Sequence, residues 1–282
     1  MSEVRVADAL AAARRQGVDR LDAQLLLARL LQRPREWLIA HDDAPLSAGQ
    51  QQHFAADCAR RAAGEPLAYL LGEREFHGLM LQVGPGVLVP RPDTETLVDW
   101  ALELLAAKPG AAPAVADLGT GSGAIALALK HARPDARICA VEHSEVALAV
   151  ARANGRRHGL DVQWQAGSWW QPLQGQRFDL VLSNPPYIAA GDPHLAALRH
   201  EPLQALSPGG DGLSDLRHIV QGAPLHLQPG GWLLLEHGHD QAEAVRALLL
   251  QADFTQVTTR SDLGGRPRCS GGRRAVRAPS DA

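Results

Sequence analysis

The four residues Asn184-Pro185-Pro186-Tyr187 carry the clearest chemical signal in the sequence. Two consecutive prolines stiffen the backbone, because proline fixes its own φ angle and restricts the residue before it. The Asn184 side-chain oxygen and the Pro185 carbonyl can then both accept hydrogen bonds, with the Tyr187 ring beside them. A planar –NH2 group fits such an edge. The tetrapeptide is also ordinary turn chemistry, and alone it does not decide between the two interpretations.

A second set of residues, Asp117-Leu118-Gly119-Thr120-Gly121-Ser122-Gly123, lies where a predicted strand meets a predicted helix. Glycines there allow a tight turn and let a ligand approach the backbone closely. Glu142 ends the next predicted strand, where a carboxylate can accept hydrogen bonds from ribose hydroxyls. The glycine spacing satisfies the dinucleotide pattern G-x-G-x-x-A. The extra Gly123 and the acidic Asp117 favour S-adenosylmethionine, which has a cationic amino-acid end and no phosphate. The loop alone leaves both cofactors open.

Two tryptophans follow the third predicted strand, in the run Gly167-Ser168-Trp169-Trp170. In a doubly wound sheet this position borders the place of an adenine ring, so we expect Trp169 to cover one face of that ring. The alternative is that one or both tryptophans are core residues, and for Trp170 the core interpretation is favoured.

Alternating strands and helices must position these residues at one edge of a sheet. The predicted strands are 114–118, 137–142, 162–165, 178–183, 231–237 and 254–259, and the predicted helices are 124–131, 144–158, 213–223 and 241–252. This alternation predicts a doubly wound, mainly parallel α/β sheet, in which ligands bind beyond the carboxyl ends of the strands. The strand before Asn184 has an apolar centre and is expected to be buried.

Residues 1–72 are predicted to form a small helical domain. Apolar residues recur there at helical spacing, and Ser47 is expected to cap a helix that runs to Ala63. The segment through Glu75 holds ten arginines and eleven acidic residues, a balance of −1. This balance argues against a basic nucleic-acid arm and favours a module that binds a protein partner.

Residues 73–92 are predicted to form a β-hairpin that links the helical domain to the sheet domain, 93–282. The hairpin is expected to pair 76–83 with 87–90 across a Gly/Pro turn. Asp93 and Thr94 are interpreted as N-cap residues of the apolar helix that follows.

The composition limits the function classes. The chain has 282 residues, 45% hydrophobic and 21% charged, which fits one large or two modest globular domains. The net charge of −3 argues against a protein that mainly binds nucleic acid. The cysteines Cys58, Cys139 and Cys269 form no C-x-x-C pair, and the histidines lack ligand spacing, so we expect neither a metal site nor a disulfide framework. Without a signal peptide or a long apolar run, we expect a cytoplasmic monomer with no membrane contact.

In combination, the glycine loop, the strand-end carboxylate and Asn-Pro-Pro-Tyr occur in an order that resembles class I S-adenosylmethionine-dependent amino-methyltransferases. Further segments resemble the PrmC/HemK family, the glutamine methyltransferases of peptide chain release factors. These segments are Pro66-Leu67-Ala68-Tyr69-Leu70-Leu71-Gly72, Phe76-His77-Gly78, Pro85-Gly86-Val87-Leu88-Val89-Pro90-Arg91-Pro92-Asp93-Thr94-Glu95, and Glu201-Pro202 with Ala205-Leu206. The resemblance covers residues 64–268, whereas the first 60 residues match only as a helical module. Ser168 departs from the family pattern, in which an acidic residue is common at this place.

The resemblance implies a Rossmann-like class I methyltransferase fold and methylation of the glutamine in a Gly-Gly-Gln loop. Cofactor contacts would come from the glycine loop (Asp117 and residues 119–123), Glu142, Trp169 and Asn184. Substrate contacts would come from 184–187, with Asn184, Pro185 and Tyr187 in the catalytic role. The –NH2 group would donate to the Asn184 oxygen and the Pro185 carbonyl, and the Tyr187 ring would pack on the amide plane.

Several points stay open at this stage. Arg91 and Glu95 either line the entrance to the site or form a structural ion pair. The arginine-rich end, which holds Arg266, Arg268, Arg273, Arg274 and Arg277, is interpreted as a solvated face and tail. The alternative functions are methylation of a ribosomal-protein glutamine and, with less support, of an adenine amino group in DNA or RNA. The adenine enzyme would need a basic face and would have to extract its base.

Overall fold

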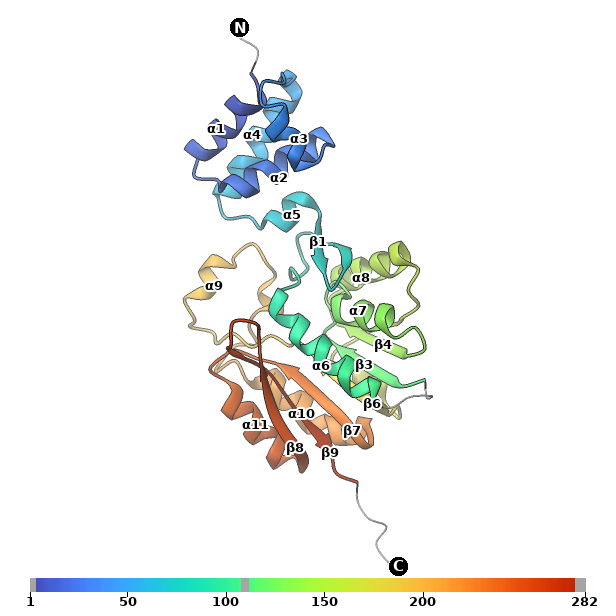
Figure 1. The fold of residues 1–282 in the computed structure, drawn as a ribbon. Coiled ribbons are helices and arrows are strands. Elements are labelled where there is room, and N and C mark those ends of the chain that lie inside the picture. The colour runs from blue at the N-terminus through green and yellow to red at the C-terminus, as the bar shows by residue number, and fades with distance from the viewer. Residues whose placement is uncertain (1–3, 108–111, 277–282) are drawn as a thin grey trace, which may run out of the picture. The chain divides into compact units, whose positions relative to one another are not determined.

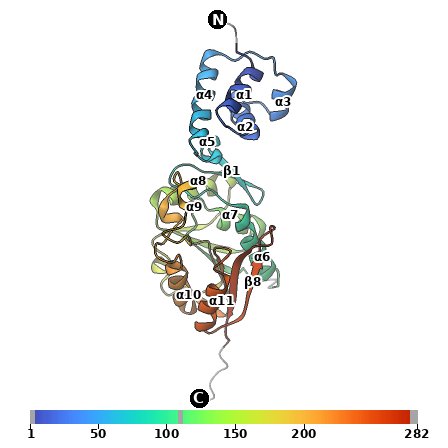
Figure 2. The ribbon, with the colours of Figure 1, turned by 90° about the vertical axis from the view of Figure 1, so that its left-hand side faces the viewer.

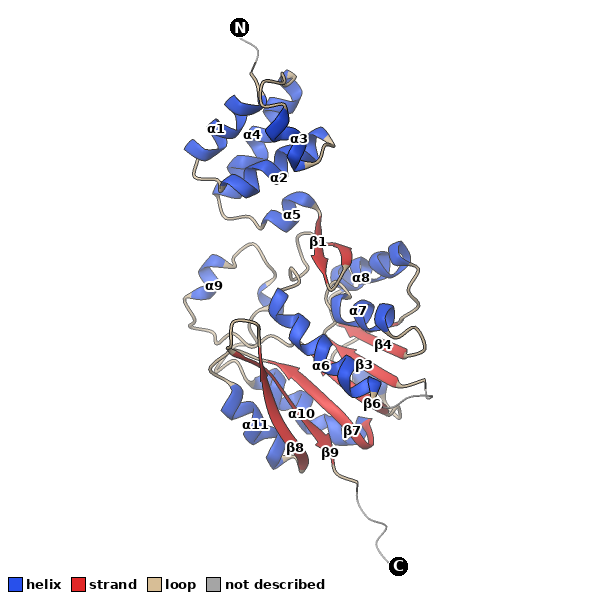
Figure 3. Ribbon diagram, viewed as in Figure 1, coloured by secondary structure: helices blue, strands red, loops and turns tan. Residues whose placement is uncertain are grey.

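The computed structural model describes residues 4–107 and 112–276 of the chain. The chain divides into two compact units, Met1–Arg74 and Glu75–Ala282. Figure 1 shows both units, and Figure 3 shows that the first is built mainly of helices, whereas most of the strands belong to one large sheet in the second. No helix in the described residues is long and apolar enough to cross a membrane.

The first unit is a helical bundle around its own apolar core. Its helices are α1 (Val6–Arg15), α2 (Arg20–Leu31), α3 (Arg35–Ala40), α4 (Ala48–Ala62) and α5 (Leu67–Leu71). Buried side chains from these helices, including Leu26, Leu27 and Phe54, form one cluster. The predicted cap of the fourth helix is confirmed, because the Ser47 hydroxyl accepts from the Gln50 N–H at 3.2 Å and the Gln50 side chain bonds back to Ser47.

A short hairpin of β1 (Glu73–Phe76) and β2 (Leu79–Gln82) follows. Its turn is His77-Gly78, with φ angles of 48° and 79°. Two consecutive positive φ angles suit a two-residue hairpin turn, because their twist matches that of the strands. The predicted hairpin pairing is therefore wrong. A turn does form at 84–87, where the Val87 N–H donates to the Gly84 carbonyl at 3.2 Å, but 87–90 is not a strand and the turn joins no strand pair.

The second unit contains a seven-stranded sheet in the order β5-β4-β3-β6-β7-β9-β8. The strands are β3 (Ala114–Leu118), β4 (Arg137–Glu142), β5 (Gln163–Ala166), β6 (Phe178–Ser183), β7 (Leu227–Glu236), β8 (Phe254–Ser261) and β9 (Pro267–Arg274). The first five in this order run parallel, whereas β9 is antiparallel to both β7 and β8. The predicted doubly wound α/β fold is confirmed, since the sequence order of the parallel strands reverses at β3.

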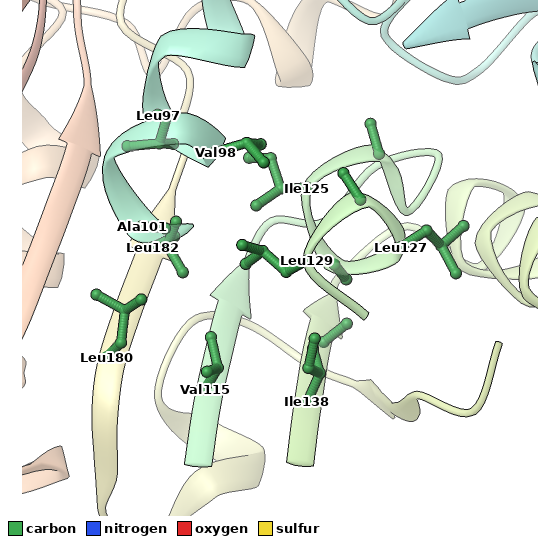
Figure 4. Close-up of a cluster of buried hydrophobic side chains, with 14 of the residues drawn as sticks. Leu97, Val98, Ala101, Val115, Ile125, Leu127, Leu129, Ile138, Leu180 and Leu182 are labelled. Atoms are coloured by element: carbon green, nitrogen blue, oxygen red, sulfur yellow. The ribbon is translucent and has the colours of Figure 1, made fainter. Parts of the chain in front are cut away.

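Helices cover both faces of this sheet. The long ones are α6 (Glu95–Ala106), α7 (Ala124–Ala132), α8 (Glu145–His158), α10 (Ser214–His226) and α11 (Ala242–Gln251). Side chains of α6 and α7 pack on one face, with Val115 and Leu180 pointing toward them, as Figure 4 shows. The next residues along the same strands, Ala116 and Val181, pack with side chains of α10 and α11 on the other face. Figure 2 shows these two helices from a second direction. Burial on both faces explains the continuous apolar runs of these strands.

Strand β9 is the main error of the sequence analysis, which treated this segment as a solvated tail. Residues 268–272 are buried between β7 and β8. Arg268 is 9% exposed and pairs with Asp93 and Asp262 at 3.1 and 3.3 Å. A Cβ at Gly271 would lie 2.5 Å from Leu234 Cδ2, so glycine is required where the neighbouring side chains approach. Arg266 is exposed as expected, and Arg277 lies outside the described residues.

Candidate active site

The loops that follow β3 and β6 leave the sheet side by side. Leu118, the last residue of β3, pairs with Ser183, the last residue of β6. The glycine loop and Asn184 therefore begin at adjacent points of one sheet edge. Glu142 ends β4 on the other side of β3, since Leu118 pairs with Val141. The topology thus brings the separate motifs of the sequence to one place, as predicted.

A cavity of about 260 Å³ opens at this edge. Among the predicted site residues, its lining includes Arg91, Gly119, Thr120, Gly121, Ser122, Glu142, Trp169, Asn184 and Pro186. The lining does not include Glu95, Asp117, Gly123, Pro185 or Tyr187. These last five residues do not line the cavity, and their direct contact with a ligand stays a prediction.

Glu142 organises the glycine loop. Its Oε2 accepts from the Gly121 N–H and its Oε1 accepts from the Ser144 N–H, both at 2.8 Å. Each carboxylate oxygen keeps a further lone pair, so Glu142 can still accept from a ligand hydroxyl. The loop is also tied to β4 directly, because the Gly119 and Thr120 N–H groups donate to the Val141 carbonyl at 2.9 and 3.0 Å.

Asp117 lies fully buried beneath the glycine loop. Its Oδ2 accepts from the Thr120 hydroxyl at 2.6 Å, while Oδ1 has no hydrogen-bond partner among the described residues. Burial raises the pKa of this carboxyl to about 7, against the lowering effect of the Thr120 bond. In this structure Asp117 holds the loop from below.

Trp169 and Trp170 take different roles. Trp169 lines the cavity with a φ of 47°, and a Cβ at Gly119 would lie 3.2 Å from its ring. Its indole ring therefore lies against the first glycine of the loop. Trp170 is 5% exposed and stacks on His226 with ring centroids 4.7 Å apart. The interpretation of Trp170 as a core residue is confirmed.

Asn184 is held by a residue far away in the sequence. Its Nδ2 donates to the Thr94 hydroxyl oxygen at 3.2 Å, and both residues line the cavity. The amide oxygen of Asn184 is then the group left to accept from a ligand. Thr94 is the N-cap residue of α6, as predicted, but its side chain makes no capping hydrogen bond. Asp93 pairs with Arg268 instead, so its interpretation as a cap is wrong.

Tyr187 is partly buried, and its hydroxyl donates to Glu236 Oε1 at 3.2 Å. Burial and the nearby Glu236 carboxyl raise the pKa of the Tyr187 hydroxyl above its usual value. The tyrosine therefore remains protonated and acts as a donor within the protein. Its predicted contact with a substrate amide stays a prediction.

Arg91 and Glu95 do not pair with each other. Arg91 forms an ion pair with Glu201, which is 6% exposed and also accepts from the Val89 N–H at 3.0 Å. Glu95 instead accepts from the backbone N–H of His77 at 3.2 Å. The ion-pair alternative for Arg91 and Glu95 is wrong, and Arg91 belongs to the lining.

Sequence reasoning missed several supporting residues. Thr94, Glu201 and Glu236 were given no role in the site, and Asn154 was read only as part of a helix. Asn154 is fully buried and bonds both backbone groups of Gln82 and the carbonyl of Ser122. The signal available for Glu236 was a carboxylate at the end of an apolar run, the same pattern that identified Glu142.

Comparison with known proteins adds independent information. The PrmC N-terminal domain model matches residues 5–72, and the methyltransferase small domain model matches residues 94–214. The release factor glutamine methyltransferase of Bordetella pertussis is 51% identical over 259 residues, covering 91% of this chain and 95% of that protein. The corresponding Xylella fastidiosa (strain Temecula1 / ATCC 700964) protein is 49% identical over 268 residues, covering 94% and 97%.

The chain belongs to the release factor glutamine methyltransferase family. Solved structures show the shared fold: a methyltransferase from Pyrococcus furiosus has a TM-score of 0.53 at 18% identity, covering 82% of this chain and 100% of that one. The family resemblance drawn from residues 64–268 is therefore confirmed. The match over residues 5–72 extends this resemblance to the helical unit, which the sequence alone had likened to the family only as a helical module.

Proposed function

We propose that this chain transfers a methyl group from S-adenosylmethionine to the side-chain nitrogen of the glutamine in the Gly-Gly-Gln loop of peptide chain release factors. The observation that carries the proposal is Asn184, whose amide nitrogen is occupied by Thr94 and whose oxygen remains available at the cavity. Membership of the family, with relatives about half identical over nearly their whole length, supports the substrate.

The lining fits S-adenosylmethionine. Glu142 supplies acceptors suited to ribose hydroxyls, and the Trp169 ring offers an apolar face beside Gly119. A Cβ added at Gly121 would meet nothing within 4 Å, so the loop leaves open space where a ligand can approach the backbone. When bound, this cofactor supplies an activated methyl group on a cationic sulfur.

The residues of the chain would act mainly by alignment. A carboxamide nitrogen is a poor nucleophile, because its lone pair is delocalised into the carbonyl group. Asn184 Oδ1 and the Pro185 carbonyl would accept from the substrate –NH2 and hold its nitrogen in line with the methyl group. Good alignment of reacting groups can supply roughly 7–11 kcal/mol. The helical unit, 1–72, would hold the protein substrate, with Arg91 at the entrance to the cavity.

The test is methyl transfer from labelled S-adenosylmethionine, offered in parallel to four substrates. These are a purified release factor, the same factor with the Gly-Gly-Gln glutamine changed to alanine, a ribosomal protein pool and duplex DNA. We expect label on the intact release factor alone. Asn184→Ala should abolish this transfer and leave cofactor binding, measured by calorimetry, largely intact.

Other outcomes would separate the alternatives. Label on ribosomal protein or DNA would retain the chemistry and overturn the substrate. Retained turnover by Asn184→Ala would contradict the role given to that side chain, and failure to bind S-adenosylmethionine would contradict the reaction itself.

A further inference from the structure

Glu201 is a buried carboxyl group beside the cavity that the proposed reaction does not use. Its side chain is 2% exposed and is not part of the cavity lining. A buried charge is costly unless it is paired and hydrogen-bonded. Here both oxygens have partners: Oε1 accepts from the Arg91 guanidinium, and Oε2 accepts from the Val89 N–H at 3.0 Å. Both partners belong to one segment, 110 and 112 residues earlier in the chain.

These contacts join two walls of the cavity. The first wall is the segment 86–94, whose lining residues are Gly86, Val87, Leu88, Pro90, Arg91 and Thr94. The second wall is the segment 202–205, whose lining residues are Pro202, Gln204 and Ala205. Glu201 directly precedes the second wall, and its side chain binds the middle of the first. It therefore connects the two walls without being part of the lining itself.

The first wall depends on contacts outside regular secondary structure. Residues 87–91 form neither a helix nor a strand, so no strand ladder pairs their backbone groups. Pro90 and Pro92 also have no N–H to donate. Buried backbone N–H groups need acceptors, and the buried Val89 finds its acceptor in the Glu201 side chain. The place of this wall thus depends on a side chain from a distant loop.

A short series of contacts connects Glu201 to Asn184. Glu201 binds the Arg91 side chain, and the Arg91 carbonyl accepts from the Thr94 N–H at 3.1 Å. This second bond closes the one-turn helix Pro92–Thr94. The Thr94 hydroxyl in turn accepts from the Asn184 –NH2 group at 3.2 Å. A shift of Arg91 should therefore move the group that orients Asn184.

We propose that Glu201 is a positioning residue, which joins the two walls of the cavity and thereby places Arg91 at the entrance and Thr94 against Asn184. It acts through the first wall and touches neither substrate nor cofactor. The joint between the walls is a property of the free protein. Its effect on methyl transfer rests on the proposed function.

The alternative is a group that only stabilises the fold. Such a group would affect the Tm but neither Asn184 nor the rate of the folded enzyme. Asp179 provides the comparison, because its carboxylate accepts from the Ala114 N–H at 3.0 Å and so also ties down a backbone segment. Ala114 and Asp179 lie at the amino ends of β3 and β6, away from the edge that holds the cavity. Asp179→Asn is therefore the matched control.

The first test follows the Val89 amide hydrogen and needs no substrate. Glu201→Ala removes the acceptor of this N–H, so its exchange with solvent, measured by NMR on ¹⁵N-labelled protein, should become about 10-fold faster or more. The Gly121 N–H, which donates to Glu142 in the same cavity, should keep its exchange rate. Asp179→Asn should change neither rate.

The second test follows the Asn184 side chain. The chain contains two asparagines, Asn154 and Asn184, so labelling asparagine with ¹⁵N gives two side-chain amide groups in an NMR spectrum. Glu201→Gln keeps the shape of the side chain but turns an –NH2 group toward one of two partners that are both donors. It should move the Asn184 signals without direct contact. Asn154, which bonds the backbone of β2 and of the glycine loop, is the internal control.

The third test is kinetic and uses saturating S-adenosylmethionine. Glu201→Gln should lower kcat about 10- to 100-fold, the range expected when a group is misplaced, at a temperature where circular dichroism shows the variant to be folded. Arg91→Met should lower kcat by a similar factor. The double variant should lose no more than the worse single variant, because residues in contact that act as one unit are not additive. Asp179→Asn should leave kcat unchanged.

Four results would overturn the inference. They are an unchanged Val89 exchange rate in Glu201→Ala, Asn184 signals that Glu201→Gln leaves in place, a wild-type kcat in Glu201→Gln, and losses of kcat that multiply in the double variant. If Glu201→Ala does not fold, the Asn184 signals of Glu201→Gln decide. If the wild-type protein methylates no substrate, the proposed function fails, whereas both NMR tests still decide on the joint between the walls.

Discussion

Changing Glu142 to glutamine should weaken binding of S-adenosylmethionine, although the two side chains have nearly the same size and shape. The Glu142 carboxylate accepts from the Gly121 and Ser144 N–H groups at 2.8 Å each. A glutamine side chain has one acceptor oxygen and one –NH2 group. One of the two backbone N–H groups would therefore face a donor, and the glycine loop would lose part of its support.

The size of the effect follows from this geometry. A hydrogen bond to a charged group contributes about 1.5–3 kcal/mol. If this loss appears wholly in cofactor binding, the Kd should rise about 10- to 150-fold, since about 1.4 kcal/mol corresponds to a factor of ten. Isothermal titration calorimetry with S-adenosylmethionine measures this change directly.

Glu145→Gln is the matched control for Glu142→Gln. Glu145 is exposed in the first turn of α8, so its substitution removes the same charge close by and breaks no hydrogen bond to the loop. Its Kd should stay near that of the wild-type protein. If Glu142→Gln binds the cofactor within about twofold of wild type, a change of less than 0.5 kcal/mol, the assignment of the loop as the cofactor site is refuted.

Three further predictions concern stability. Asn154→Leu removes the side-chain partner of the Gln82 backbone and leaves the buried Ser122 carbonyl unpaired, which should cost about 1–3 kcal/mol in urea unfolding. Gly271→Ala places a Cβ 2.5 Å from Leu234 Cδ2 and should cost about 1–3 kcal/mol, measured as a lower Tm. Asp117→Asn should stabilise the fold more at pH 8 than at pH 5, measured as the difference in Tm from wild type at each pH.

The sign of the Asp117 prediction follows from its pKa. The carboxyl titrates near 7 in the fold and near its ordinary value of 3.8 in the unfolded chain. Between these values the folded state binds more protons, so the free energy of unfolding falls as the pH rises, and the cost is largest above 7. Asparagine cannot ionise, so it does not incur this cost. A difference in Tm that shrinks from pH 5 to pH 8 would contradict the burial argument.

The predictions for Asn154→Leu and Gly271→Ala can each be contradicted by one result. A cost below about 1 kcal/mol for Asn154→Leu would mean that water satisfies the backbone groups. For Gly271→Ala the matched control is Gly191→Ala, whose added Cβ would meet nothing within 4 Å. Equal Tm values for these two variants would mean that the neighbours of Gly271 move aside without cost.

The sequence was most informative where a local pattern had one structural solution. Apolar runs placed β3, β4 and β6 with the bounds that the structure shows. β9 was missed because its centre, Cys269-Ser270-Gly271-Gly272, lacks the apolar and β-branched residues that indicate a strand. Its glycines are needed only because Trp100, Leu234 and Phe254 approach from neighbouring elements. Such approach depends on tertiary structure and leaves no local signal.

The same limit applies within the site. Asn184 and the glycine loop were predicted because each is a short segment with its own chemistry. The partner of Asn184 was not predicted, because Thr94 lies 90 residues earlier and had a sufficient local explanation as a helix cap. The hairpin was misplaced for a related reason. The Gly/Pro segment does form a turn, but residues 87–90 after it are not a strand, and β1 pairs with β2 across His77-Gly78 instead.

Three carboxylates lie at or near the carboxyl ends of parallel strands, and none of them needs to act on the substrate. Asp117 accepts from the Thr120 hydroxyl, Glu142 accepts from two backbone N–H groups, and Glu236 accepts from the Tyr187 hydroxyl. If each acts only through what it holds, substitutions should affect different quantities. Asp117→Asn should alter the pH dependence of stability, Glu142→Gln the Kd of the cofactor, and Glu236→Gln the kcat at unchanged Kd. A kcat effect of equal size from all three would instead indicate a shared role in the chemical step.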